Sequence, residues 1–277
     1  MRKTRLSALF ALLLLGLAVF ATACGSDSDT SGGGGETTAS TEAEGGGGEP
    51  LSVASDIPYP PFEQGKPGEY TGFDIELMEA IGEEIGRTPE FNDASFETIF
   101  RDVAQGKFEA VISAATITEE REKVVDFSDP YYLSEQAILV KEGSDITGIE
   151  DLAGETVGAQ QGTTGLELGK EKADAGELRP YPEGPDAINA LKAGTVAAVI
   201  IDAPVAANAV EAGGVEIAEK VPTEEEYGIA VAKGDTELLD AINEGLSAII
   251  ENGKYTTIYE KWFKEAPPQE ILAQEAE

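Results

Sequence analysis

Short apolar segments rich in β-branched residues alternate with helix-like segments from Leu51 onward. This alternation is typical of α/β layers with largely parallel strands. We predict strands at 51–55, 110–113, 137–141, 156–159, 197–201 and 228–232. We predict helices at 73–86, 96–105, 118–124, 186–193, 236–251 and 255–263. The segment from residue 50 to residue 277 is long enough for one large domain or two smaller ones, and the periodicity does not choose between them.

The first 24 residues have the pattern of a secretory signal. Arg2, Lys3 and Arg5 precede an apolar run over 6–20, which small residues and Cys24 follow. The run is shorter than the roughly 20 residues that a membrane-spanning helix needs. We therefore expect residues 1–24 to be a signal peptide that is removed.

Cys24 is the one cysteine of the chain, so it cannot form an internal disulfide. Its setting resembles the lipobox of bacterial lipoproteins, although Ala21 stands where that family most often has leucine. The resemblance implies that Cys24 receives a diacylglycerol and acyl chains such as palmitate, and anchors the mature protein to the outer face of the cell membrane. The segment 21–23 also fits the A-x-A pattern of ordinary cleavage, which would release the protein.

Residues 25–49 contain no aliphatic side chain larger than alanine, and they are expected to form a flexible linker. The remainder, 50–277, has 16 basic and 47 acidic residues and hence a net charge of −31. This charge argues against a nucleic acid partner. It is typical of a solvated surface, and it mildly favours cationic over anionic ligands.

The chain contains no histidine. This removes the commonest general base, the Ser-His and Cys-His nucleophile pairs and the most frequent transition-metal ligand. The segment DSDTSGGGG is only superficially a calcium loop, because Thr38 stands where the bidentate glutamate belongs, twelfth from Asp27. We therefore expect no enzyme activity, metal or cofactor, and we expect the acidic cluster 224–226 to be an exposed turn.

Polar residues follow three of the predicted strands, at the strand ends where open α/β sheets bind ligands. The strand 110–113 leads to Thr116, Glu119 and Arg121. Thr116 and Glu119 have the spacing of a capping box. Arg121 is either a surface partner of the neighbouring glutamates or a ligand-binding cation.

The other two strand ends allow similar alternatives. Thr163 and Thr164 open a predicted helix, where hydroxyls and free NH groups suit either an ordinary cap or a bound carboxylate. Asp202 ends the most apolar strand just before Pro204, as a helix cap or as a ligand for a cation.

Eight ordered segments resemble the solute-binding proteins of the polar amino acid type that serve ABC importers, the bacterial extracellular family 3. They are SDIPYPPFE, TGFDIELMEAIGEEIG, FRDVAQGKFEAVISAATITEERE, VDFSDPYY, EDLAGETVGAQQGTTG, AAVIIDAPVA, YGIAVAKGD and NGKYTTIYEKWF. The resemblance covers about 51–264. It implies a two-lobed fold of the periplasmic-binding-protein type II, with two mixed or parallel sheets flanked by helices and two hinge crossings.

The same resemblance implies where the lobes divide. Lobe 1 would comprise 50–138 plus 229–277, and lobe 2 would comprise 139–228. The crossings would lie near 137–140 and near 227–230.

The resemblance also implies roles for residues that would contact a bound amino acid. Arg121 would clamp the α-carboxylate, with Thr116 as a hydroxyl partner and Thr163 and Thr164 as donors from the other lobe. Asp202 would receive the α-ammonium. Burying a zwitterion does require a fork-shaped cation for one end and a carboxylate for the other.

Asp56, Tyr59 and Phe96 match the positions around the ligand side chain, and Phe96 is also a candidate core residue. Two departures stand out. Ala114 replaces a frequent glycine, and its carbonyl could still accept from the ammonium, while Glu119 replaces a frequent proline at a helix start.

The resemblance therefore implies an extracytoplasmic, monomeric receptor that binds a free amino acid, polar or basic, and delivers it to an ABC permease. Two alternatives are an enzyme on the same scaffold, similar to the cyclohexadienyl dehydratases, and a sensory module like the related lobes of receptor kinases.

Overall fold

The computed structural model describes residues 48–274, which form two five-stranded sheets. The first sheet has the order β2-β1-β3-β10-β4 and the second has the order β7-β6-β8-β5-β9. We call each sheet with its helices lobe 1 and lobe 2, respectively. The predicted signal peptide, Cys24 and the linker up to residue 47 lie outside the described residues. Glu49, which the sequence placed in the linker, is the first residue of β1 and pairs with Arg87.

Lobe 1 has a mixed sheet. Its strands are β1 (Glu49–Ser55), β2 (Arg87–Asp93), β3 (Ala110–Val111), β4 (Val125–Phe127) and β10 (Ala230–Ala232). β1 pairs in parallel with β2 and β3, whereas β10 runs antiparallel to both β3 and β4.

Lobe 2 is also mixed, and two long strands dominate it. Its strands are β5 (Tyr132–Lys141), β6 (Thr156–Gln160), β7 (Glu177–Tyr181), β8 (Ala198–Asp202) and β9 (Val215–Tyr227). β6 runs parallel to β7 and β8, and β5 runs antiparallel to both β8 and β9. The two-sheet fold inferred from the resemblance is therefore confirmed, with more antiparallel pairing than the periodicity predicted.

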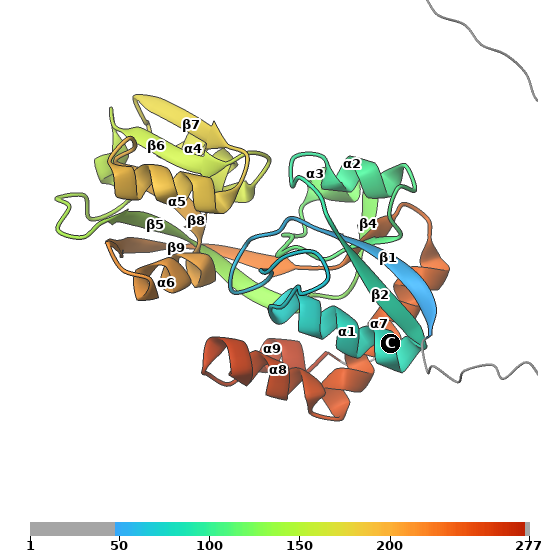
Figure 1. The fold of residues 1–277 in the computed structure, drawn as a ribbon. Coiled ribbons are helices and arrows are strands. Elements are labelled where there is room, and N and C mark those ends of the chain that lie inside the picture. The colour runs from blue at the N-terminus through green and yellow to red at the C-terminus, as the bar shows by residue number, and fades with distance from the viewer. Residues whose placement is uncertain (1–47, 275–277) are drawn as a thin grey trace, which may run out of the picture. The chain divides into compact units, whose positions relative to one another are not determined.

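Helices flank both sheets (Figure 1). They are α1 (Phe73–Ile85), α2 (Ile99–Ala104), α3 (Glu119–Glu122), a 3-10 helix (Ile149–Leu152), α4 (Thr164–Lys172), α5 (Gly184–Ala193), α6 (Ala203–Glu211), α7 (Thr236–Glu251), α8 (Lys254–Phe263) and α9 (Gln269–Leu272). α1 buries Phe73, Leu77, Ala80 and Ile81, which recur at helical spacing. Within residues 48–274, no helix is long and apolar enough to cross a membrane.

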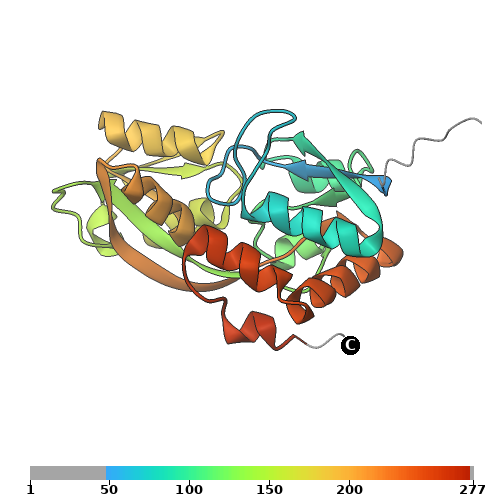
Figure 2. The same cartoon turned by 60° about the horizontal axis from the view of Figure 1, so that its bottom comes forward.

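The chain passes between the lobes twice (Figures 1 and 2). It goes from β4 to β5 and returns from β9 to β10. The segment 137–140, expected to be a crossing, lies inside β5 between β8 and β9. At the other end of β5, Tyr132 pairs with Tyr227 of β9, and the two buried rings stack with centroids 5.5 Å apart.

The sequence missed four strands, β2, β4, β7 and β9, and each of them is an edge of its sheet. Edge strands have one side of their backbone unpaired, and proline and charged residues are tolerated there. β2 reads RTPEFND, β7 reads ELRPY and β9 includes VPTEEEY. Because these three strands are rich in polar residues, a pattern of apolar β-branched residues does not reveal them.

Candidate functional site

A small cavity lies between the lobes, and all nine residues predicted to contact a ligand line it. They are Asp56, Tyr59, Phe96, Ala114, Thr116, Arg121, Thr163, Thr164 and Asp202. Ser113 and Gln160, which the sequence analysis did not single out, complete the lining. The space open to the centres of water molecules is only ≈ 10 Å³, about enough for one water. A molecule as large as an amino acid therefore fits only if the walls move apart.

Arg121 belongs to α3, whose first turn sets its position. The helix is capped by Thr118, whose hydroxyl accepts a hydrogen bond from the Arg121 backbone NH at 3.2 Å. The predicted capping box of Thr116 and Glu119 is therefore wrong, and the hydroxyl of Thr116 points elsewhere. Surface pairing of Arg121 is also wrong, because its side chain is buried.

The guanidinium of Arg121 is held by backbone carbonyls and aromatic rings. It donates to Thr116 O at 2.5 Å and, across the cavity, to Gly162 O at 3.2 Å. Its Cζ lies 5.1 Å from the ring centre of Phe96 and 4.7 Å from that of Phe100, within the range of a cation–π contact. Burial lowers the pKa of Arg121 to about 10, so it stays charged at neutral pH.

Asp202 ends β8 and is buried at the opposite wall. Its Oδ2 accepts from the Tyr59 hydroxyl at 2.6 Å, and its Oδ1 accepts from Gln136 Nε2 at 2.5 Å. Asp202 occupies the N-cap position of α6, as one of the two alternatives expected, but its side chain makes no capping hydrogen bond. Burial, followed by the charge of Glu225, raises the pKa of Asp202 to about 7.

Asp56 follows β1 and contacts lobe 2 directly. Its Oδ2 accepts from Gln160 Nε2 at 2.5 Å, and its backbone NH donates to Ser113 Oγ at 2.9 Å. Burial is the largest influence on this carboxyl and raises its pKa to about 6. Like the Tyr59–Asp202 pair, this side-chain contact joins the lobes across the cavity.

The hydroxyls of the two threonines at the start of α4 have different hydrogen-bond partners. Thr163 is an ordinary N-cap, because its hydroxyl accepts from Leu166 N at 3.2 Å and donates to Gln160 O at 2.9 Å. The hydroxyl of Thr164 instead donates to Glu225 at 3.0 Å.

Glu225 is a buried acid beside the cavity, and the prediction of an exposed turn at 224–226 is wrong for it. The whole segment belongs to β9, in which Glu224 and Glu226 are exposed while Glu225 points inward. The period-two alternation of a strand could have indicated this, but the polar composition of β9 concealed the strand itself.

Two further acids lie behind the part of the cavity lining that lobe 1 supplies, Ser113 and Ala114 among it, which we call the lobe 1 wall. Glu63 Oε1 accepts from Ser113 Oγ at 2.8 Å. Asp74 Oδ2 accepts from Ala114 N at 2.7 Å and from the Tyr131 hydroxyl at 2.9 Å. Both carboxyls are fully buried. Burial raises the pKa of Asp74 to about 7 and that of Glu63 well above its usual value, with the nearby Asp74 as a further cause for Glu63.

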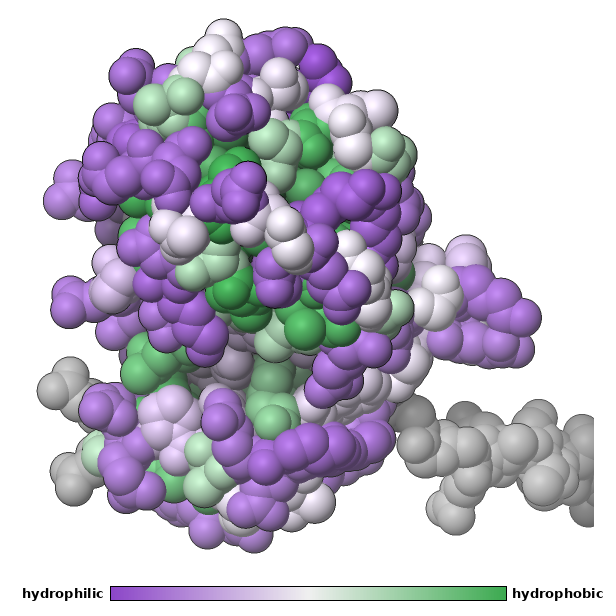
Figure 3. Space-filling view, turned by 90° about the vertical axis from the view of Figure 1, so that its left-hand side faces the viewer, coloured by the Kyte–Doolittle hydropathy of each residue, from purple (hydrophilic) through white to green (hydrophobic). Residues whose placement is uncertain are grey.

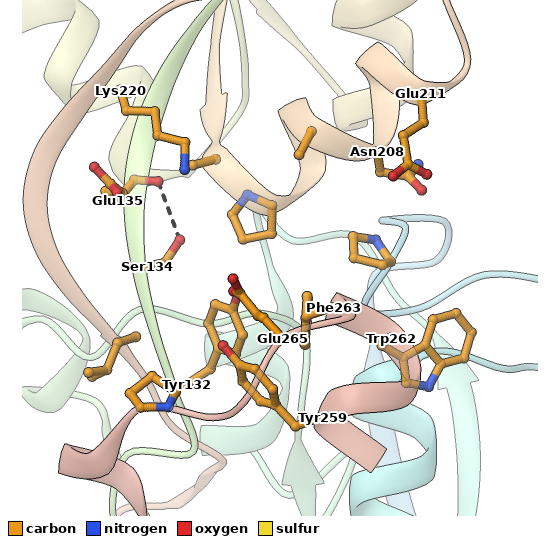
Figure 4. A pocket seen from close by; sticks show the side chains of 16 residues that line it. Tyr132, Ser134, Glu135, Asn208, Glu211, Lys220, Tyr259, Trp262, Phe263 and Glu265 are labelled. Atoms are coloured by element: carbon orange, nitrogen blue, oxygen red, sulfur yellow. Dashed lines mark hydrogen bonds between the residues drawn. The ribbon is translucent and has the colours of Figure 1, made fainter. Parts of the chain in front are cut away.

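A larger groove of ≈ 400 Å³ lies elsewhere, between β5, α6 and the α8–α9 segment (Figure 4). Its lining includes Tyr132, Glu135, Glu211 and Trp262, and it contains none of the nine predicted residues. Figure 3 shows a mostly hydrophilic face on which apolar residues gather in recesses. Among residues 48–274, no group of three or more His, Cys, Asp or Glu side chains could hold a metal ion.

Comparison with known proteins identifies the family and supports the fold. Residues 51–265 match the bacterial extracellular solute-binding proteins, family 3. The chain belongs to this family. Among its family 3 relatives is the ABC transporter glutamine-binding protein GlnH of Bacillus subtilis, which is 33% identical over 271 residues, covering 95% of this chain and 97% of GlnH.

Two solved structures are similar to this family 3 protein. An ancestral arginine-binding protein bound to glutamine is 42% identical with a TM-score of 0.75, covering 78% of this chain and 98% of that one. The ancestral amino acid-binding protein AncCDT-1, described as a precursor of cyclohexadienyl dehydratase, is 39% identical with a TM-score of 0.73, covering 77% and 95%.

Proposed function

We propose that this family 3 protein is the extracytoplasmic substrate-binding component of an ABC importer and binds a free amino acid between its lobes. One observation carries the proposal: a buried cation, Arg121, and a buried acid, Asp202, line one small cavity from different lobes. An amino acid is a zwitterion, and its two charged ends require such partners once water is excluded. The fold and the amino-acid-binding relatives support the same function.

The charge of the site favours a polar or basic side chain on the ligand. Asp56, Asp202 and Glu225 are buried in or beside a cavity that has one arginine, and Asp56 lies in the lobe 1 wall and accepts from the amide of Gln160. A cationic or amide group can bind a carboxylate there, whereas an acidic side chain would be repelled.

Delivery to a permease calls for a protein held near the membrane. The predicted lipidation of Cys24 and the Gly-rich segment 25–49 would supply the anchor and the tether. Lipidation, the monomeric state and the lobe boundary at 228/229 are parts of the proposal that rest on sequence alone. The boundary expected at 138/139 would divide β5, which belongs as a whole to the lobe 2 sheet.

An enzyme is the second candidate, and two observations favour it. AncCDT-1 is similar to this chain and is described as a precursor of an enzyme, and the pKa of Asp202, about 7, suits a general acid near neutral pH. Incubation with prephenate or arogenate tests this candidate. Loss of either substrate would favour the enzyme, and unchanged substrate would favour the receptor.

Calorimetry of the protein from Gly25 onward against the twenty amino acids tests the proposal. We expect one or a few polar or basic amino acids to bind with about micromolar or better affinity. If none binds, the proposal is wrong. Asp56→Ala should weaken a basic ligand about tenfold more than it weakens alanine or leucine, and an equal loss for all ligands would contradict the assignment of Asp56 to the side chain.

A further inference from the structure

The hydroxyls of Thr116 and Thr164, assigned above to the ligand carboxylate, already have an acceptor. Both donate to Oε2 of Glu225, at 2.6 Å from Thr116 and 3.0 Å from Thr164. Thr116 comes from lobe 1 and Thr164 from lobe 2. The carboxylate of Glu225 thus binds the same pair of donors, one from each wall, that a ligand carboxylate at Arg121 would need.

The position of Glu225 is fixed by its other oxygen. Oε1 accepts from Gln136 Nε2 at 2.9 Å and from the Thr223 hydroxyl at 3.1 Å. The side chain is only 6% exposed, so water does not screen its charge effectively. Burial lowers the pKa of Arg121, and among the neighbouring charges Glu225 opposes this lowering most strongly. A fixed negative charge therefore lies on the side of the cavity where, under the proposed function, the negative α-carboxylate of the ligand would bind.

A threonine hydroxyl has a single hydrogen to donate. While Thr116 and Thr164 donate to Glu225, they cannot donate to a second carboxylate. We propose that Glu225 is an internal competitor for the α-carboxylate of the ligand, which must take these two hydroxyls from it and bind against its charge. The inference rests on the proposed function. It adds that Glu225 lowers the affinity for the ligand by acting against the α-carboxylate, the group that all amino acids share.

The inference predicts a difference between two ligands that differ only at that end. The probes are the tightest-binding amino acid of the twenty and its own α-carboxamide, for example L-arginine and L-argininamide. Calorimetry compares the wild type with Glu225→Gln. We expect the substitution to tighten binding of the amino acid about tenfold and to change binding of the neutral amide less than about twofold.

The structure offers a matched control and a means of accommodating the substitution. Glu226→Gln removes the same charge from the next residue of β9, whose side chain is exposed, and should leave both affinities unchanged. In Glu225→Gln the new amide oxygen can take the place of Oε1 and accept from Gln136 Nε2 and the Thr223 hydroxyl. The new amide nitrogen can donate to the hydroxyls of Thr116 and Thr164 in place of Oε2, so the variant can keep its fold.

Three results would overturn the inference. The first is weaker amino acid binding by Glu225→Gln, which would make Glu225 a partner of the ammonium. The second is an equal change for acid and amide. The third is a wild type that binds no amino acid, which would remove the proposed function as well; the first two results leave it intact.

Glu225→Asp provides the test if Glu225→Gln does not fold. It keeps the charge but draws the carboxylate back from the two hydroxyls by about one methylene. It should then favour the amino acid over the amide by about threefold relative to the wild type. No change in that preference would overturn the inference.

Discussion

The two walls of the cavity are held in place differently. In lobe 1, Ala114 and Asp56 are fixed from behind, because Asp74 accepts from the NH of Ala114 and Ser113 links Asp56 to Glu63. In lobe 2, Asp202 and Gln160 each bond to a residue on the opposite wall. The lobe 1 wall is therefore held by acids of its own lobe, whereas the lobe 2 wall takes part of its hydrogen bonding from lobe 1.

Removing the cation of the lobe 1 wall should have the largest effect. Arg121→Ala is expected to weaken amino acid binding at least about a hundredfold, because a buried carboxylate would lose its charged donor. Calorimetry measures the affinity, and a thermal melt checks that the fold persists. Arg101→Ala removes an exposed arginine of α2 and should leave binding unchanged. Retained affinity in Arg121→Ala would contradict the clamp.

Neutralising the acid of the lobe 2 wall should have a smaller effect. Asp202→Asn is expected to weaken binding about thirtyfold, because the ammonium loses its charged partner while the ligand carboxylate keeps Arg121. In the wild type, affinity should also fall as the pH drops below about 7, where Asp202 becomes protonated. A calorimetric pH series measures both effects, and a variant with unaltered affinity would exclude Asp202 from the site.

The acids behind the lobe 1 wall should make stability depend on pH. The pKa of Asp74 is raised from 3.8 to about 7, and that of Glu63 is raised above 4.5. At a pH between the ordinary pKa of each group and its raised pKa, the folded state binds more protons than the unfolded state. The free energy of unfolding therefore falls as the pH rises through this range. We expect the ligand-free protein to be about 2 kcal/mol more stable at pH 5 than at pH 8.

Urea denaturation at the two pH values measures this difference. The double variant Glu63→Gln with Asp74→Asn carries neutral groups at both pH values, so the difference should shrink. An undiminished difference would assign it to other carboxyls, Asp56 and Asp202 among them.

The smallest expected effect concerns the backbone of the lobe 1 wall. Ala114 has φ 45°, a left-handed conformation that glycine adopts without strain and alanine does not. Ala114→Gly should raise the free energy of unfolding by about 0.5 kcal/mol, as urea denaturation would show. Ala115→Gly is the control, since Ala115 is buried without positive φ and should lose stability. A loss in both variants would mean that the conformation of Ala114 is not strained.

The sequence was informative where a polar residue interrupts an apolar strand and uninformative where a strand is polar throughout. Asp56, Arg121 and Asp202 follow apolar strands near the middle of their sheets, and together with the resemblance they led to the cavity. Glu225 lies on an edge strand whose residues resemble a loop, so its burial depends on pairing with β5, which no local pattern reveals.

Contacts behind the site were beyond prediction for a different reason. Glu63 and Asp74 were within segments that carried the resemblance, but their burial follows from how α1 and the loop after β1 pack around Ser113 and Ala114. Thr116 and Thr118 illustrate the same limit at short range, since both precede the helix at plausible capping distances. Only the backbone geometry shows which hydroxyl caps α3.

The place of β10 has a consequence for the order in which the molecule can assemble. This strand joins β3 to β4 within the lobe 1 sheet, yet it follows every strand of lobe 2 in the sequence. All five strands of lobe 2 lie within one continuous stretch, 132–227. During synthesis from the N-terminus, the lobe 2 sheet therefore has all its strands available first. Lobe 1, which contains the first strands of the sequence, is completed last, when β10 pairs with β3 and β4 from far along the chain.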